Sequence, residues 1–105
     1  MDTARKKRLE SKGWKFGTVQ EFLGLTDAET ALIELHLSLA KSVRERRLKL
    51  GLTQVEVAKR LGSSQARVAK MESADPSVSL DLFISSLLKL GVSRSEVGRV
   101  IGRAA

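Results

Sequence analysis

The sequence of 105 residues has no cysteine and no tyrosine, and it has only one histidine, one tryptophan and one proline. Without cysteine it offers no disulfide, no thiolate metal ligand and no cysteine nucleophile. One histidine leaves too little imidazole for a typical zinc site or a catalytic triad. No apolar run approaches the ~20 residues that cross a membrane as a helix. We therefore expect no metal, no cofactor and no insertion into a membrane.

Groups that could carry out catalysis are equally scarce. Asp and Glu occur only at spacings typical of solvated helix surfaces. His36 falls in the middle of a leucine-rich helical stretch, where a partly buried or interface position is more common than a ligand or a base. Trp14 is interpreted as a packing anchor rather than as a stacking platform. The composition therefore favours a binding protein over an enzyme.

The net charge of +7 is unevenly distributed along the chain. Residues 17–37 contain four acidic residues and no Lys or Arg, whereas residues 38–73 contain nine Lys and Arg against three Glu. A basic segment suits a polyanion such as DNA, although solvated helix surfaces give the same charge. Residues 1–13 are predicted to be a basic disordered arm, more often a solvated tail than a minor-groove contact. Because these residues are not followed by the apolar stretch of a signal peptide, we expect a cytoplasmic protein.

Capping residues divide the rest of the chain into helices. Ser or Thr followed three residues later by Glu is the pattern of a capping box, and Gly commonly follows the last turn of a helix. The boxes are Thr18 with Glu21, Thr26 with Glu29, Thr53 with Glu56, and Ser93 with Glu96, and the terminating glycines are Gly24, Gly51, Gly62 and Gly91. A long helix is expected over residues 27–50, and shorter helices over 53–61, 64–72, 79–90 and 93–101. No segment alternates like a strand, so the predicted fold class is all-α.

The long helix carries more apolar side chains than one face holds. Ala28, Ala31, Leu32, Leu35, Leu39 and Val43 form one row, and Ile33 and Leu37 form a second. Two rows call for more than one packing surface, which favours a dimer or a bound protein. A kink near Ser38 that folds both rows into one core is the alternative, and the sequence does not decide between them.

Residues 53–73 have the pattern of two short helices joined by a tight turn. Two helices cross steeply only where the contact residue is small, and Ala58 is such a residue. Gly62 tolerates the positive φ of the turn. Val68 is expected to pack the second helix against the first, with Val57, Leu61 and Met71 completing the buried side. Gln65, Ala66, Arg67 and Lys70 then face outward, which is the arrangement of a helix-turn-helix that reads a DNA major groove.

The exposed residue types match the chemistry of base edges. Gln65 can bond adenine through two hydrogen bonds, Arg67 and Lys70 can reach guanine or phosphate, and Ala66 can touch a thymine methyl group. Gln54 begins the first helix of the motif, where its side chain and the free N–H groups can contact a phosphate. The sequence therefore predicts DNA as the partner.

Residues 43–92 resemble the XRE, or Cro/C1-type, family of helix-turn-helix regulators. The resemblance is carried by Arg47 to Gln54, Val57-Ala58, Leu61-Gly62, Ser64-Gln65, Val68, Met71-Glu72 and Leu90 to Ser93. It implies a five-helix lambda-repressor-like domain, phosphate contacts by Gln54 and Ser64, and an ion pair between Arg47 and Glu72. The full set of DNA-binding residues that we predict is Gln54, Ser63, Ser64, Gln65, Ala66, Arg67 and Lys70.

The sequence departs from that family after the recognition helix. The family turn has Gly where this chain has Ser73-Ala74-Asp75-Pro76, so a phosphate contact by the loop is weakly supported and Ser77 is its only candidate.

The N-terminal third has its own resemblance. Residues 13–26, followed by the acidic helix, resemble XRE-type antitoxins of the HigA-like group, which pair with a small basic RelE/HigB-like toxin. An acidic segment beside an apolar row suits a basic partner. A packing extension that enlarges the core or a homodimer interface explains the same residues.

These observations define the expected organisation. Residues 1–13 form the arm, 14–37 a helical extension, and 38–105 the helix-turn-helix domain, with recognition helix 64–72. We expect a sequence-specific regulator, a repressor, acting as a homodimer because one recognition helix contacts only a few base pairs. The dimer face is either the last helix or the rows of residues 28–39. An antitoxin that also represses its own operon is the alternative function.

Overall fold

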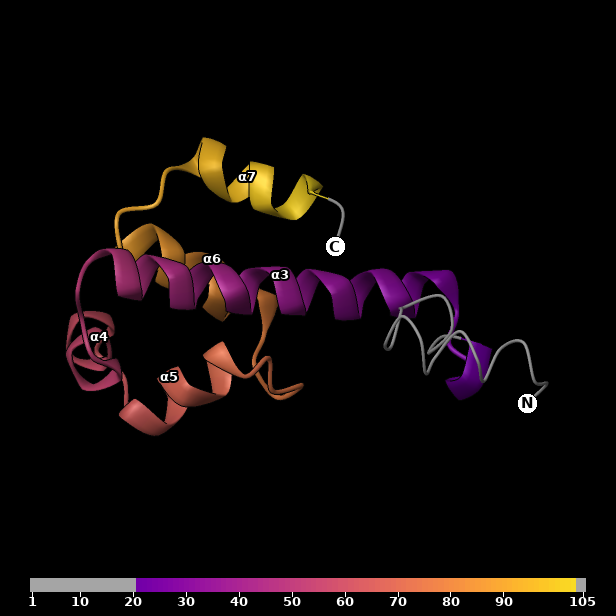
Figure 1. Cartoon of the computed structure of the whole chain (residues 1–105), viewed down its shortest axis with the longest axis horizontal. Helices are drawn as coiled ribbons and strands as arrows, with labels where there is room; N and C mark the ends of the chain where they lie inside the picture. The colour runs from indigo at the N-terminus through magenta and orange to yellow at the C-terminus, as the bar shows by residue number, and fades with distance from the viewer. Residues whose placement is uncertain (1–20, 104–105) are drawn as a thin grey trace, which may run out of the picture. The chain divides into compact units, whose positions relative to one another are not determined.

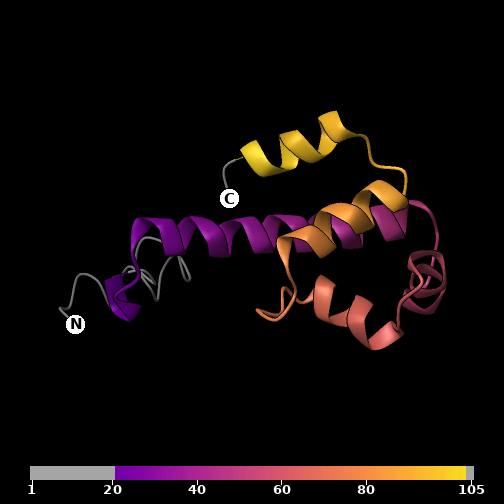
Figure 2. The ribbon, with the colours of Figure 1, turned by 180° about the vertical axis from the view of Figure 1, so that it is seen from behind.

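The computed structural model describes residues 21–103, and within that range every regular element is helical (Figures 1 and 2). A single turn at residues 21–23 precedes five helices. These are α3 (Asp27–Lys49), α4 (Gln54–Leu61), α5 (Gln65–Glu72), α6 (Leu80–Lys89) and α7 (Arg94–Gly102). The predicted all-α, five-helix class with an N-terminal helical segment is thus confirmed. The predictions for the arm, Trp14 and Thr18 fall outside the described residues.

The chain divides into two compact units, residues 1–33 and 34–105. In the described part of the first unit, Gly24 has φ +69° and ends the short turn. The Thr26 amide donates to Glu29 Oε1 at 3.0 Å, and the Glu29 amide donates to Thr26 Oγ1 at 3.1 Å, so the expected capping box is present. The bond from the Thr26 amide, and after it the Thr26 side chain, lower the pKa of the Glu29 carboxyl group.

Helix α3 is one uninterrupted helix whose apolar rows are not all buried. Leu39, Ala40 and Val43 lie in the core, whereas Leu32, Ile33 and Leu37 are 47%, 39% and 44% exposed. The alternative in which both rows fold into one core is therefore wrong. Leu39, Ala40 and Val43 are the side chains of α3 that pack into the core of residues 34–105.

The core of residues 34–105 is built around side chains that are almost fully buried. Phe83 and Leu87 come from α6, Val57 and Ala58 from α4, Val68 and Met71 from α5, and Val97 and Val100 from α7. The His36 ring meets Phe83 edge-on, with centroids 5.7 Å apart and planes at 89°. His36 is half-buried, as expected, and its Nδ1 atom is buried with no hydrogen-bond partner. Figures 1 and 2 show α5 and α7 on opposite sides of the C-terminal half of α3.

The helix ends confirm most of the capping predictions. Thr53 and Glu56 form a complete capping box at the start of α4. Ser64 and Ser79 cap α5 and α6 by accepting from backbone amides. The box predicted at the start of α7 is only half formed: the Ser93 hydroxyl accepts from the Glu96 amide. The Glu96 carboxylate lies instead near Arg99 on the same helix and near Arg103 just after it, at 3.3 and 4.0 Å.

Helix α5 ends in the same positive-φ backbone conformation as α3, α4 and α6, but it does so without a glycine. Gly51, Gly62 and Gly91 follow α3, α4 and α6 with positive φ, and after α5 the same position is held by Ala74 at φ +57°. The Asp75 amide donates to the Lys70 carbonyl at 3.0 Å, which is the long bond of a Schellman motif. The missing glycine therefore does not change the turn. It places an alanine in a conformation that costs about 1–2 kcal/mol for an L-residue.

Among residues 21–103, no helix has the length and apolar character needed to cross a membrane.

Candidate nucleic-acid interface

Helices α4 and α5 pack against each other through small and branched side chains. Ala58 is 4% exposed and Val57, Val68 and Met71 are at most 1% exposed, while Leu61 packs at the edge of the same cluster. A short side chain at Ala58 lets the two backbones approach closely. The buried side is the one predicted, and it fixes which face of α5 is left for a ligand.

The turn between the two helices is held by its own hydrogen bonds. Gly62 has φ +64°, and the Ser63 amide donates to the Ala58 carbonyl at 2.9 Å. The Ser64 hydroxyl oxygen accepts from the Arg67 amide at 3.2 Å. Because an accepting hydroxyl keeps its own proton, Ser64 can cap α5 and still donate to a phosphate oxygen.

The predicted DNA-binding residues lie on one continuous part of the molecule. Gln65, Ala66, Arg67 and Lys70 are exposed on α5, and Ser64 is exposed just before it. Ser63 and Gln54 are half-buried at the turn and at the first position of α4. These positions follow from the spacing in the sequence, because α5 can bury only one side.

A chain of side-chain hydrogen bonds connects the exposed face to the interior. Gln65 Nε2 donates to Gln54 Oε1 at 2.7 Å, and Gln54 Nε2 donates to Glu72 Oε1 at 3.4 Å. Glu72 in turn receives Arg47 Nε at 2.6 Å and Arg47 Nη2 at 2.9 Å. The contact between the two glutamines could not be predicted from the sequence, because it depends on how α4 crosses α5.

The Arg47–Glu72 pair is largely removed from solvent. The Arg47 side chain is 14% exposed and that of Glu72 is 6% exposed. Arg47 Nη1 also donates to the Leu52 carbonyl at 3.1 Å, which ties α3 to the segment that leads into α4. The hydrogen bonds that Arg47 donates to Glu72 raise the pKa of Arg47. The pair therefore joins α3, the segment before α4, and α5, and the ion pair implied by the family resemblance is present.

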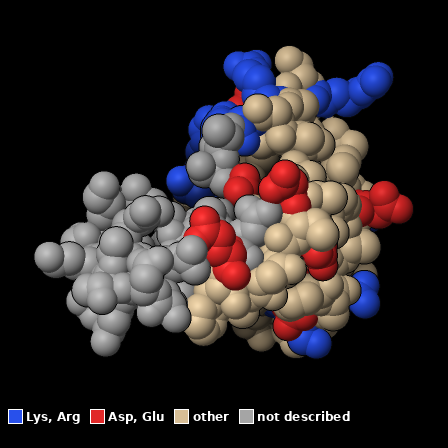
Figure 3. All heavy atoms as spheres, turned by 90° about the vertical axis from the view of Figure 1, so that its right-hand side faces the viewer, with Lys and Arg blue, Asp and Glu red and all other residues tan. Residues whose placement is uncertain are grey.

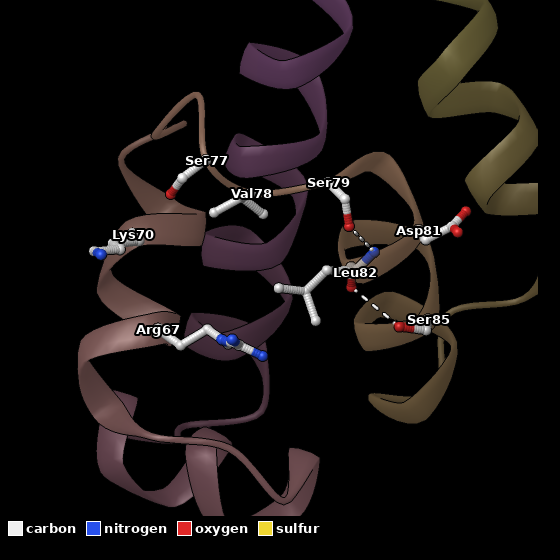
Figure 4. A pocket seen from close by; sticks show the side chains of 8 residues that line it. All are labelled: Arg67, Lys70, Ser77, Val78, Ser79, Asp81, Leu82 and Ser85. Atoms are coloured by element: carbon white, nitrogen blue, oxygen red, sulfur yellow. Dashed lines mark hydrogen bonds between the residues drawn. The ribbon is translucent and has the colours of Figure 1, made fainter.

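A cleft of about 490 Å³ lies between α5 and the start of α6 (Figure 4). Arg67 extends toward α6, alongside Leu82 and Ser85, whereas Lys70 points away from α6. Ser79 and Ser85, which sequence reasoning did not select, also line this cleft. Both cations of α5 line this cleft, and their side chains diverge from each other.

Ser77 is poorly suited to hold a phosphate. Its amide and its hydroxyl both donate to Asp75 Oδ1, at 2.9 and 2.7 Å. These bonds, the one from the hydroxyl first, lower the pKa of Asp75. The donors that a phosphate would need are engaged, and a carboxylate stands next to them.

On the face drawn in Figure 3, Lys and Arg atoms lie along the upper and lower edges, with Asp and Glu atoms between them. Within residues 21–103, no three His, Asp or Glu side chains are grouped so that they could hold a metal ion. The case for a nucleic-acid ligand rests on the hydrogen-bonding residues of α5.

Comparison with known proteins gives one match. The model of the helix-turn-helix family HTH_3 matches residues 43–97, slightly more than half of the chain. The match runs from the middle of α3 into α7 and includes both helices of the motif. No curated protein and no solved structure matches the chain.

Proposed function

The chain belongs to the helix-turn-helix family HTH_3, and we propose that it is a transcriptional repressor that binds a specific operator as a homodimer. Membership of this family makes it a DNA-binding regulator of the XRE type, a regulatory rather than an enzymatic class. The observation that carries the more specific proposal is the exposed face of α5, where Gln65, Ala66 and Lys70 stand over a buried Val68. Such a face fits the major groove with its polar side chains toward the base edges.

The roles divide between base readers and residues that hold the DNA backbone. Gln65 and Lys70 are assigned to base edges, and Ala66 to a thymine methyl group. Gln54, Ser63 and Ser64 are assigned to phosphates because they lie at the ends of α4 and α5, where backbone N–H groups are free. Arg67 is assigned to the backbone, since its side chain runs toward α6 and away from the exposed ridge of α5.

The homodimer is proposed because one short helix reads too few base pairs for a specific site. Two apolar side chains at the end of the domain support it: Leu88 on α6 is 42% exposed and Ile101 on α7 is 40% exposed. Gly98 and Gly102 on α7 have open space beside them, so another helix can approach closely there.

Selection of bound duplexes from a random DNA pool tests this function directly. We expect a palindromic winner with half-sites about one helical turn apart, and affinity that falls steeply with salt. Gln65→Ala and Lys70→Ala should each cost about 1–3 kcal/mol and relax the preference at one base pair. Gln54→Ala should weaken binding to every sequence, because it removes a phosphate contact.

Lys41→Ala is the matched control, because Lys41 is 77% exposed and lies on α3 outside the motif. It should leave both the selected sequence and its affinity unchanged. A pool without any enriched sequence would contradict the proposal.

A second function, as an antitoxin bound to a small basic RelE/HigB-like toxin, is favoured by the first unit. Leu32 and Ile33 are 47% and 39% exposed and lie near Glu29, in a segment without Lys or Arg. A basic protein with an apolar groove would suit such a surface.

The antitoxin hypothesis predicts a short basic open reading frame next to this gene. Its product should co-purify with the wild type and with Leu48→Asp, but not with Ile33→Asp. Leu48 provides the control because it is equally apolar, 57% exposed and near the other end of α3. Equal co-purification of both variants would rule out this surface.

A further inference from the structure

We propose that Glu72 is a positioning residue for base recognition: it fixes the amide orientation of Gln54 and, through Gln54, that of Gln65. This inference rests on the proposed function, because it assumes that α5 lies in the major groove. Glu72, at the buried end of α5, would thus help to select the base that Gln65 reads at the exposed start of the same helix.

The starting point is a carboxylate that can only accept hydrogen bonds. Both Glu72 oxygens face Arg47, with Oε2 at 2.6 Å from Nε and Oε1 at 2.9 Å from Nη2. Oε1 also accepts from Gln54 Nε2 at 3.4 Å. The Glu72 side chain is 6% exposed, so water does not readily replace these donors. Either oxygen of this carboxylate can only accept, so Gln54 meets an acceptor whichever oxygen faces it.

An acceptor in a fixed position decides which way Gln54 points. The amide group of glutamine has a donating and an accepting end, and only the NH₂ end can face a carboxylate. The Gln54 oxygen is then directed away from Glu72, where it receives Gln65 Nε2 at 2.7 Å. Gln65 must donate to that oxygen, so its own amide orientation is fixed in turn.

Gln65 is therefore left with a defined set of unused hydrogen-bond donors and acceptors. One N–H is used by Gln54, which leaves one N–H donor and the carbonyl oxygen, side by side. Adenine presents one acceptor and one donor in the major groove and can use both, whereas guanine presents two acceptors. Facing guanine, Gln65 would satisfy one acceptor and direct its oxygen at the other. The chain from Arg47 to Gln65 therefore favours adenine.

Glu72→Gln is the direct test, because a neutral amide can turn either end toward Gln54. The measurement is the dissociation constant for four operators that differ only at the base pair whose preference Gln65→Ala abolishes. The wild type should prefer adenine there by about tenfold or more. In Glu72→Gln this ratio should fall to within about threefold, with an unchanged salt slope.

Arg47→Lys is the matched control. It disturbs the same ion pair, since lysine cannot form two parallel bonds to a carboxylate, but it leaves the Glu72 oxygens in place. We expect the adenine preference to be retained. Circular dichroism at the assay temperature checks that both variants are folded.

A second variant keeps the test valid if Glu72→Gln does not fold. Gln54→Met removes the middle of the chain without touching the ion pair, and it should reduce the adenine preference in the same way. Because the result is a ratio between operators, a uniform loss of phosphate binding cancels.

The two possible failures are distinguishable. A wild type that selects no sequence would overturn the proposed function, and the role of Glu72 with it. A wild type that prefers adenine, together with a folded Glu72→Gln or Gln54→Met that prefers it equally, would overturn the role of Glu72 alone. If Arg47→Lys lost the adenine preference as much as Glu72→Gln, the ion pair would act only through the stability of the domain. This result would also overturn the role of Glu72.

Discussion

Removal of one member of the Arg47–Glu72 pair should strongly destabilise the domain. Glu72→Ala leaves a guanidinium with 14% side-chain exposure and without its two hydrogen bonds of 2.6 and 2.9 Å. Breaking a fully buried pair in this way costs about 3–5 kcal/mol. Arg47 keeps some contact with water and a bond to the Leu52 carbonyl, so we expect about 3 kcal/mol. The free energy of unfolding of a native domain is about 5–15 kcal/mol, so this loss is a large fraction of the total stability.

Urea unfolding followed by circular dichroism measures this loss. A double variant, Arg47→Met with Glu72→Leu, should lose less than either single alanine variant, because it leaves no unpaired charge in the interior. Lys41 and Glu45 provide the exposed counterpart, at 3.9 Å with side chains 77% and 62% exposed. Replacing either of these two by alanine should change the free energy of unfolding by less than about 0.5 kcal/mol.

Two results would refute this reasoning. A loss below about 1 kcal/mol in Glu72→Ala, with an unchanged denaturant slope, would mean that the pair is not effectively buried. A double variant less stable than both single variants would mean that the pair contributes more than apolar packing at the same positions.

Three further predictions concern single residues. Ala74→Gly should raise the free energy of unfolding by about 0.5–1 kcal/mol, because φ +57° strains alanine and not glycine; a lower midpoint in urea would contradict this. Ala58→Leu should cost about 1–3 kcal/mol or more by overpacking the contact between α4 and α5, and normal DNA binding by this variant would argue against the helix-turn-helix geometry. Bonds from Thr53 lower the folded-state pKa of Glu56 below its ordinary value of 4.5. This contribution to stability is therefore present above pH 4.5 and lost as the pH falls through the folded-state pKa, so Glu56→Gln should flatten the acid side of a stability–pH curve.

Helix boundaries could be predicted because their causes are local. Thr26 and Glu29, like Thr53 and Glu56, satisfy each other's backbone amides across three residues, and no distant part of the chain is needed. Ser93 shows the limit of the same rule. Its hydroxyl caps α7 as predicted, but the Glu96 carboxylate lies near Arg99 on α7 and Arg103 just after it.

The burial of apolar side chains could be predicted only where a neighbour was also known. The pattern of α3 identified Leu39 and Val43 correctly as one packed row, because helical spacing places them on one side. Leu32 belongs to the same predicted row and Leu37 to the second row, and both are exposed. Periodicity gives the direction of a side chain, and only the rest of the fold determines whether something lies there.

The interface shows the same distinction at the level of hydrogen bonds. Spacing placed Gln65 on the exposed side of α5, but it could not tell which of its donors and acceptors stay free. That depends on Gln54, eleven residues earlier, and on Glu72, two turns later on the same helix. Gln54 reaches both because α4 crosses α5, and the crossing depends on Ala58. A residue type indicates which bases can be read, and the orientation set by buried neighbours selects among them.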